Sequence, residues 1–122
     1  GLGDVYKRQK QGFSSMKSVI LTKYGAPEVL KVKEFQDPEP KDNEVRIKVH
    51  YAGINFAEIM SRMKLYPGGP KPGSVLGFEA SGIVDKIGKN IKDITIGEKV
   101  IGLSLSGSYS SHICIDKNLI IP

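Results

Sequence analysis

Two histidines and one cysteine are the residues best suited to bind a metal, and their spacing argues against a metal site. His50 and His112 fall in separate stretches of alternating apolar and polar residues, with no cysteine or carboxylate at ligand spacing. Cys114 is the single cysteine, so no disulfide can form within the chain. We therefore expect no zinc site, strand-face roles for both histidines, and a buried thiol at Cys114.

The glycine- and serine-rich segment at residues 102–111 does not carry the usual signature of a nucleotide site or of a serine nucleophile. No G-x-G-x-x-G follows a strand, and residues 102–107 lack the Lys-Ser/Thr pair of a phosphate-binding loop. None of the serines stands in a G-x-S-x-G motif with an acid and a histidine following in order. This segment is better explained as a turn that leads into a strand, and no nucleotide cradle is expected in this part of the protein.

Length and charge indicate one ordinary globular domain. The chain has 122 residues, of which 39% are hydrophobic and 25% charged, enough to bury a core without disulfides or metal. The net charge of +5 is thinly spread, and no block of five or six basic residues exists, which argues against nucleic-acid binding. No apolar run is long enough to span a membrane and no secretory signal opens the chain, so we expect a cytoplasmic protein.

The first fifteen residues are expected not to belong to the native domain. They show neither helical nor strand periodicity, whereas Met16 is followed directly by an apolar strand pattern. In one reading frame, residues 1–9 match what the adapter of transposon-based sequencing libraries would encode. We therefore interpret residues 1–15 as an adapter-derived or upstream segment and assign them no part in fold or function, with the native or foreign origin of residues 10–15 left open.

From residue 16 onward, short β-rich runs separated by Gly, Pro, Asn and Asp clusters predict a mainly β fold, a barrel rather than βαβ repeats. Residues 17–22 and 29–35 are predicted to form a hairpin, because the glycine and proline between them supply a turn. Residues 45–51 alternate apolar with polar and form the clearest strand. Further strands are predicted at residues 80–87, 99–103, 109–115 and 119–121.

One short helix and one irregular loop complete the prediction. Apolar residues recur at three- and four-residue spacing over residues 55–63, and Asn55 is placed to cap the first turn. Residues 66–77 are rich in proline and glycine, so they are expected to form a loop. Loops of this kind, carried on a rigid scaffold, often line binding sites.

The chain resembles the GroES-like N-terminal domain of medium-chain dehydrogenases/reductases, over residues 16–122. Within that superfamily it is most similar to the zinc-independent branch of quinone oxidoreductases and zeta-crystallins, vesicle-amine-transport-like members included. The stretch G-x-N-F-A-E at residues 53–58 and L-Y-P at 65–67 point to this branch. The other matching motifs are Y-G-A-P-E-V-L at 24–30, P-G-S-V-L-G-F-E-A-S-G-I-V at 72–84, G-E-K-V at 97–100 and G-S-Y-S-S at 107–111.

Two departures from the zinc-dependent members of the superfamily bear on the mechanism. Asn55 stands where those enzymes place their first zinc cysteine, and Phe78 stands where they place the histidine of Gly-His-Glu. An amide and a phenyl ring cannot replace a thiolate and an imidazole on Zn²⁺. The resemblance therefore implies hydride transfer without a zinc ion, with Phe78 closing the emptied metal pocket and Glu79 more plausible as a structural partner than as a base.

The resemblance also implies which residues face the ligands. It places Asn55 at the nicotinamide end of the cofactor and Tyr66 in the substrate cleft, although Asn55 could serve only as a helix cap and Tyr66 only as a lid on the loop. Met60 replaces a tyrosine that some relatives carry. The implied protein is an NAD(P)H-dependent reductase of a quinone, enone or activated carbonyl, with NADPH preferred and a homodimer expected.

The same resemblance implies that residues 16–122 are the substrate-side part of that reductase and are inactive alone. The Rossmann domain that would bind most of the cofactor is expected to follow residue 122. Two alternatives remain open, namely a non-catalytic interaction or trafficking module on the same scaffold, and a 2-enoyl-thioester reductase.

Overall fold

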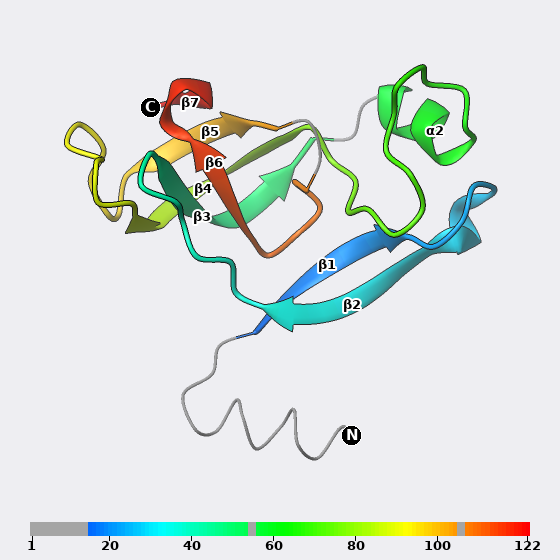
Figure 1. Cartoon of the computed structure of the whole chain (residues 1–122), viewed down its shortest axis with the longest axis horizontal. Helices are drawn as coiled ribbons and strands as arrows, with labels where there is room; N and C mark the ends of the chain where they lie inside the picture. Colours follow the sequence, from blue (N-terminus) through cyan, green and yellow to red (C-terminus); the bar gives the residue numbers. More distant parts are fainter. Residues whose placement is uncertain (1–14, 54–55, 105–106) are drawn as a thin grey trace, which may run out of the picture.

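The computed structural model describes residues 15–53, 56–104 and 107–122, and within them the fold is almost entirely β (Figure 1). A two-stranded sheet pairs β1 with β2, and a five-stranded sheet has the order β6-β3-β4-β5-β7. All pairings between these strands are antiparallel. The strands are β1 Ser15–Leu21, β2 Leu30–Gln36, β3 Glu44–Ala52, β4 Glu79–Ile87, β5 Lys99–Leu103, β6 His112–Asp116 and β7 Ile120–Ile121.

The predicted hairpin is confirmed, with a short 3₁₀ helix, η1 (Pro27–Val29), inserted before β2. Proline begins this helix, as its fixed φ favours. Leu21 pairs with Leu30 at the closed end, and the Thr22 hydroxyl donates a hydrogen bond to the Val29 carbonyl at 2.5 Å. The hairpin is therefore closed by local contacts that the sequence between the two strands supplies.

The main core is built by apolar residues that alternate with more exposed ones along β3 and β4. Val45, Ile47 and Val84 are completely buried, while the residues next to each of them in the same strand are more exposed. Ile91, Val100, Ile113 and Ile115 complete this cluster from neighbouring segments. A second, smaller cluster of Leu21, Val29 and Leu76 packs the hairpin against the loop that precedes β4.

Helix α2 (Phe56–Arg62) is the one α-helix in the described part of the chain, and its end is tightly closed. The Leu65 amide donates to the Met60 carbonyl at 2.7 Å and the Lys64 amide to the Ser61 carbonyl at 3.2 Å. Lys64 adopts a left-handed φ of 63°, a position that glycine usually fills. This closure fixes the direction in which the chain leaves the helix toward Tyr66.

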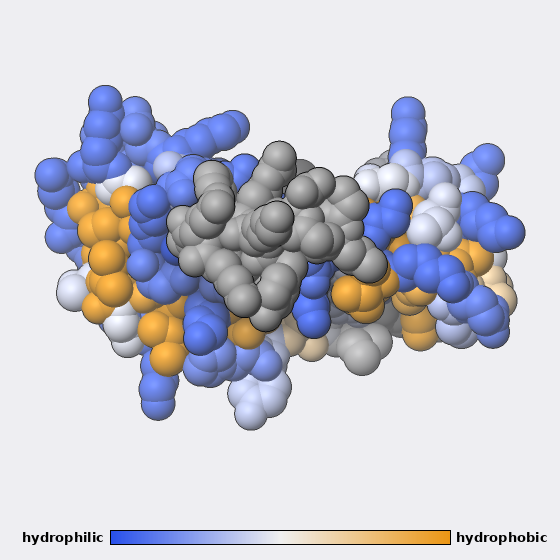
Figure 2. Space-filling model, turned by 90° about the horizontal axis from the view of Figure 1, so that it is seen from below, coloured by the Kyte–Doolittle hydropathy of each residue, from blue (hydrophilic) through white to orange (hydrophobic). Residues whose placement is uncertain are grey.

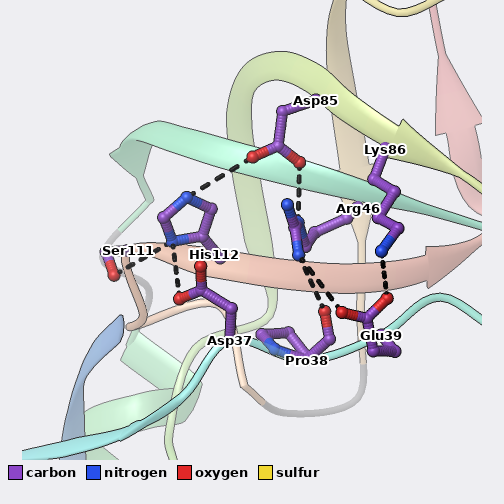
Figure 3. Close-up of polar contacts among 8 residues, drawn as sticks. All are labelled: Asp37, Pro38, Glu39, Arg46, Asp85, Lys86, Ser111 and His112. Atoms are coloured by element: carbon purple, nitrogen blue, oxygen red, sulfur yellow. Dashed lines mark hydrogen bonds and ion pairs between the residues drawn. The ribbon is translucent and has the colours of Figure 1, made fainter. Parts of the chain in front are cut away.

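A cluster of charged side chains ties the segment between β2 and β3 to the outer face of the large sheet (Figure 3). Arg46 lies at its centre and donates from Nε to Asp85 at 2.8 Å and from Nη1 to the Pro38 carbonyl at 3.3 Å. The His112 ring lies between two carboxylates, with 3.7 Å from Nδ1 to Asp37 Oδ1 and 3.5 Å from Nε2 to Asp85 Oδ2. His112 therefore lies on a strand, as predicted, and its ring contacts carboxylates from two other segments.

The partly open GroES-like barrel with one short helix is confirmed, with changes at element ends. The predicted strand at 109–115 begins only at His112, and residues 117–119 form a second 3₁₀ helix, η2 (Lys117–Leu119), before β7. Cys114 is half-buried, not fully buried, and burial raises the pKa of its thiol to about 12. The interpretation of residues 1–15 as adapter-derived or upstream sequence stays a prediction: residues 1–14 fall outside the described residues, and Ser15, which was given no part in the fold, is the first residue of β1 and pairs with Gln36.

Candidate functional site

An aromatic pair, Tyr66 and Phe78, forms the centre of the candidate site. Their ring centroids lie 6.2 Å apart at an interplanar angle of 49°, which is a favourable tilted contact. Tyr66 remains 41% exposed, so its ring offers a surface to a ligand as well as to Phe78. The structure thus brings together two of the three predicted site residues, whereas Asn55 lies outside the described residues.

The loop that carries Tyr66 is held on both sides. Leu21 of β1 donates to the Ser74 carbonyl at 3.0 Å and accepts from the Gly73 amide at 2.7 Å, so the end of the loop pairs with the hairpin. The Tyr24 hydroxyl donates to the Pro70 carbonyl at 3.4 Å, and the Lys64 ammonium lies 5.5 Å from the Tyr24 ring centroid. The predicted irregular loop is therefore held in place by hydrogen bonds to β1 and to Tyr24.

Phe78 is positioned by a close approach between two chain segments. Gly77 has a φ of +112°, and a Cβ there would lie 2.6 Å from the Tyr109 amide nitrogen, so only glycine fits. The Tyr109 amide donates to the Leu76 carbonyl at 2.8 Å, and the Ser104 amide donates to the Phe78 carbonyl at 2.8 Å. These contacts leave the backbone of Phe78 little freedom to move.

Glu58 joins helix α2 to the same junction. Its side chain is only 3% exposed, its Oε1 accepts a hydrogen bond from the Phe78 amide at 3.2 Å, and its Oε2 accepts one from the Tyr109 hydroxyl. Burial, together with this hydrogen bond to Glu58, raises the pKa of Tyr109. The phenol therefore stays protonated as the donor over the whole physiological range.

A hollow of about 300 Å³ opens beside this junction, on the side of β3 and β4. The Glu79 carboxylate lies so close to Gly53 that a Cβ at Gly53 would collide with Oε1. The Gly53 amide also donates to the Glu79 carbonyl at 3.2 Å. Gly53, the last described residue before Asn55 in the sequence, is thus held against Glu79. The hollow is lined by Tyr51, Ala52, Gly53, Glu79, Ala80, Ser81 and Ile101.

Apolar side chains reach the surface at the end of the molecule that carries α2 and the loop after it. Ile59, Met63 and Leu65 are 38%, 50% and 58% exposed, and Tyr66 adjoins them in sequence. Figure 2, which views the molecule from the side of the β1–β2 hairpin, shows hydrophobic surface among hydrophilic side chains at the same end of the molecule. The aromatic pair therefore belongs to a region that offers apolar contact to a ligand or to further protein.

The residues of the described ranges form no cluster of three or more His, Cys, Asp or Glu that could hold a metal ion. None of the helices within those ranges is long and apolar enough to cross a membrane. Glu58 and Tyr109 were not predicted as site residues, although both lie in the motifs that carry the resemblance. An acidic residue in the first turn of the predicted helix was the only signal, and it does not reveal a partner 51 residues away.

Comparisons with known families agree with the mainly β fold and its one short helix. Residues 41–122 match the alcohol dehydrogenase GroES-like domain. The chain belongs to this family, and its relatives place it with the quinone oxidoreductases and VAT-1 homologues of the medium-chain dehydrogenases/reductases.

Quinone oxidoreductase 1 of Escherichia coli is 43% identical over 103 residues, which cover 82% of this chain and 31% of that protein. The structure of the human synaptic vesicle membrane protein VAT-1 homolog-like protein superposes with a TM-score of 0.84 at 31% identity, over 88% of this chain and 34% of that one. The Escherichia coli quinone oxidoreductase complexed with NADPH gives a TM-score of 0.80 at 38% identity, over 86% and 32%. The chain thus spans about a third of the length of these relatives.

Proposed function

We propose that this chain is the substrate-side part of a zinc-independent reductase that transfers a hydride from NADPH to a quinone, enone or activated carbonyl. The observation that carries the proposal is the ring contact between Tyr66 and Phe78. These residues lie at the two ends of the loop that hydrogen bonds hold to β1. A flat acceptor fits against such an aromatic wall, because offset or tilted ring contacts are favourable. Similarity to quinone oxidoreductases, one of them complexed with NADPH, supports the same reaction class.

The residues of this chain contribute the acceptor's surroundings rather than the reducing power. When bound, the reduced nicotinamide supplies the hydride, and the acceptor gains that hydride together with one proton from solvent. Tyr66 and Phe78 orient the acceptor and exclude water from one side, and Asn55 is proposed to contact the nicotinamide end. Most of the cofactor's contacts are assigned to the part of the protein beyond residue 122.

The absence of zinc from the proposed mechanism rests on the side chains available. Phe78 offers no ligand atom, and Asn55 offers only an amide. Without a Lewis acid, the acceptor is polarised by hydrogen bonds and by close placement against the cofactor. The homodimer and the cytoplasmic location remain predictions of the same proposal.

The test is NADPH oxidation at 340 nm by the full-length protein with 1,4-benzoquinone as acceptor, with and without EDTA. We expect turnover that EDTA leaves unchanged, and we expect residues 1–122 alone to be inactive. Tyr66→Ala should raise the acceptor KM, whereas Phe35→Ala, which removes a similarly exposed ring from β2, should not. Activity that EDTA abolishes and zinc restores would contradict the zinc-independent mechanism.

Similarity to the human VAT-1 homolog-like protein supports a second candidate, a non-catalytic interaction module. A full-length protein that binds NADPH but reduces no acceptor would favour this candidate. Turnover of enoyl-CoA substrates that depends on acyl-chain length, without turnover of benzoquinone, would instead indicate a 2-enoyl-thioester reductase.

A further inference from the structure

We infer that Glu58 is a positioning residue of this site: its carboxylate sets helix α2 against Phe78 and thereby determines where the Tyr66 ring meets the Phe78 ring. The inference deepens the proposed function and rests on it for its kinetic consequences. Its geometric basis is independent of turnover, because it depends only on the contacts of Glu58 with the Phe78 amide and the Tyr109 hydroxyl.

Glu58 is an unusual residue to bury, and its burial needs compensation. A carboxylate at 3% exposure loses most of its hydration, which is costly unless hydrogen bonds replace the water. The Phe78 amide and the Tyr109 hydroxyl provide such bonds from two segments that are distant from α2 in sequence. The helix is therefore locked to both segments through a single side chain.

The lock acts on Tyr66 through the rigid end of the helix. The hydrogen bonds from Leu65 to Met60 and from Lys64 to Ser61 carry the chain directly from α2 to Tyr66. On the other side, the Phe78 backbone is bonded to both Glu58 and Ser104. A displacement of Glu58 relative to Phe78 must therefore change the contact between the two rings.

The experiment compares three variants in the full-length protein. Glu58→Ala removes both of these hydrogen bonds, Tyr109→Phe removes only one, and Glu58→Gln keeps an oxygen for the Phe78 amide. Misplacement by about 1 Å can lower reactivity a hundredfold. We expect Glu58→Ala to reduce kcat/KM for 1,4-benzoquinone by roughly tenfold to a hundredfold, Tyr109→Phe to have a smaller effect, and Glu58→Gln to recover within about threefold of wild type.

Controls separate positioning from general loss of stability. NADPH affinity should change less than about twofold in all three variants, because most cofactor contacts are assigned elsewhere. Val45→Ala, in the main core, serves as a variant of comparable thermal destabilisation that should leave the acceptor KM unchanged. An acceptor KM that rises as much in Val45→Ala as in Glu58→Ala would overturn the inference.

A second readout does not need turnover. Nuclear Overhauser contacts between the Tyr66 and Phe78 ring protons should be present in wild type and Glu58→Gln and lost or weakened in Glu58→Ala. Unchanged contacts in a folded Glu58→Ala protein would overturn the inference whatever the kinetics. If wild type reduces no acceptor, the proposed function fails, and this spectrum alone decides the role of Glu58.

Discussion

Replacing Arg46 by Met should destabilise the fold far more than the same change at Lys86, although both residues belong to the cluster in Figure 3. The Arg46 side chain is 14% exposed and bonds to Asp85, which is 27% exposed, at 2.8 Å. The Lys86 ammonium pairs with Glu39 at 2.5 Å, but the two side chains are 47% and 67% exposed. The two substitutions remove one charge each and leave an apolar side chain of similar length.

The magnitude depends on the contacts that each substitution removes. Arg46→Met deletes a charged hydrogen bond to Asp85 and a second one to the Pro38 carbonyl, and we expect a loss of about 2–3 kcal/mol in the free energy of unfolding. In a domain of this size, that loss lowers Tm by roughly 10 °C or more. Lys86→Met should not be resolved from wild type, because solvent screens an exposed ion pair.

The assay is urea and thermal unfolding followed by far-ultraviolet circular dichroism, at low salt and in 1 M NaCl. At 1 M salt the Debye length is about 3 Å, so any effect of Lys86→Met should vanish while most of the Arg46→Met effect persists. Equal destabilisation by the two substitutions would refute the reasoning. So would the disappearance of the Arg46→Met effect in 1 M salt.

Four other predictions concern the backbone at Gly77, the thiol of Cys114 and the core at Leu21. Gly77→Ala should lower the free energy of unfolding in urea by more than about 2 kcal/mol, because the new Cβ both strains the backbone at positive φ and lies 2.6 Å from the Tyr109 amide nitrogen. Gly97→Ala is the control for backbone strain alone, because Gly97 has a φ of +98° but a Cβ there would meet no atom within 4 Å. Cys114 should react with iodoacetamide at pH 8 about a thousandfold more slowly than in urea, because its pKa is raised from 9.0 to about 12, and comparable rates would contradict the burial argument. For the same reason the folded state binds a proton that the unfolded state has lost, so the contribution of Cys114 to stability should decline as pH rises from about 9 to about 12 and be absent from Cys114→Ala. Leu21→Ala should lower the free energy of unfolding, measured by urea denaturation, by about 2–5 kcal/mol, because Leu21 is completely buried. A loss below about 1 kcal/mol would show that the hairpin is not packed on the loop.

Local patterns predicted much of the fold because strand faces and turns depend on neighbouring residues. The alternation over residues 45–51 and 80–87 corresponds to β3 and β4, and glycine and proline mark the hairpin and the long loop. The prediction failed at residues 109–111, which precede β6 directly but form only an isolated bridge between Ser110 and Ser18. Tyr109 bonds instead to Leu76 and Val19 across the molecule, and no local pattern encodes these partners.

The candidate site, like the fold, was predicted from the sequence only in part. The residue types alone excluded a thiolate and an imidazole at positions 55 and 78, and the motifs indicated that Tyr66 and Phe78 matter. The sequence did not show that their rings touch, nor that Glu58 is buried between the Phe78 amide and Tyr109, because those partners lie 20 and 51 residues away. These contacts form only when the two sheets and α2 pack together. Packing buries the Glu58 carboxylate, and a buried carboxylate that has lost its water needs hydrogen bonds from the protein.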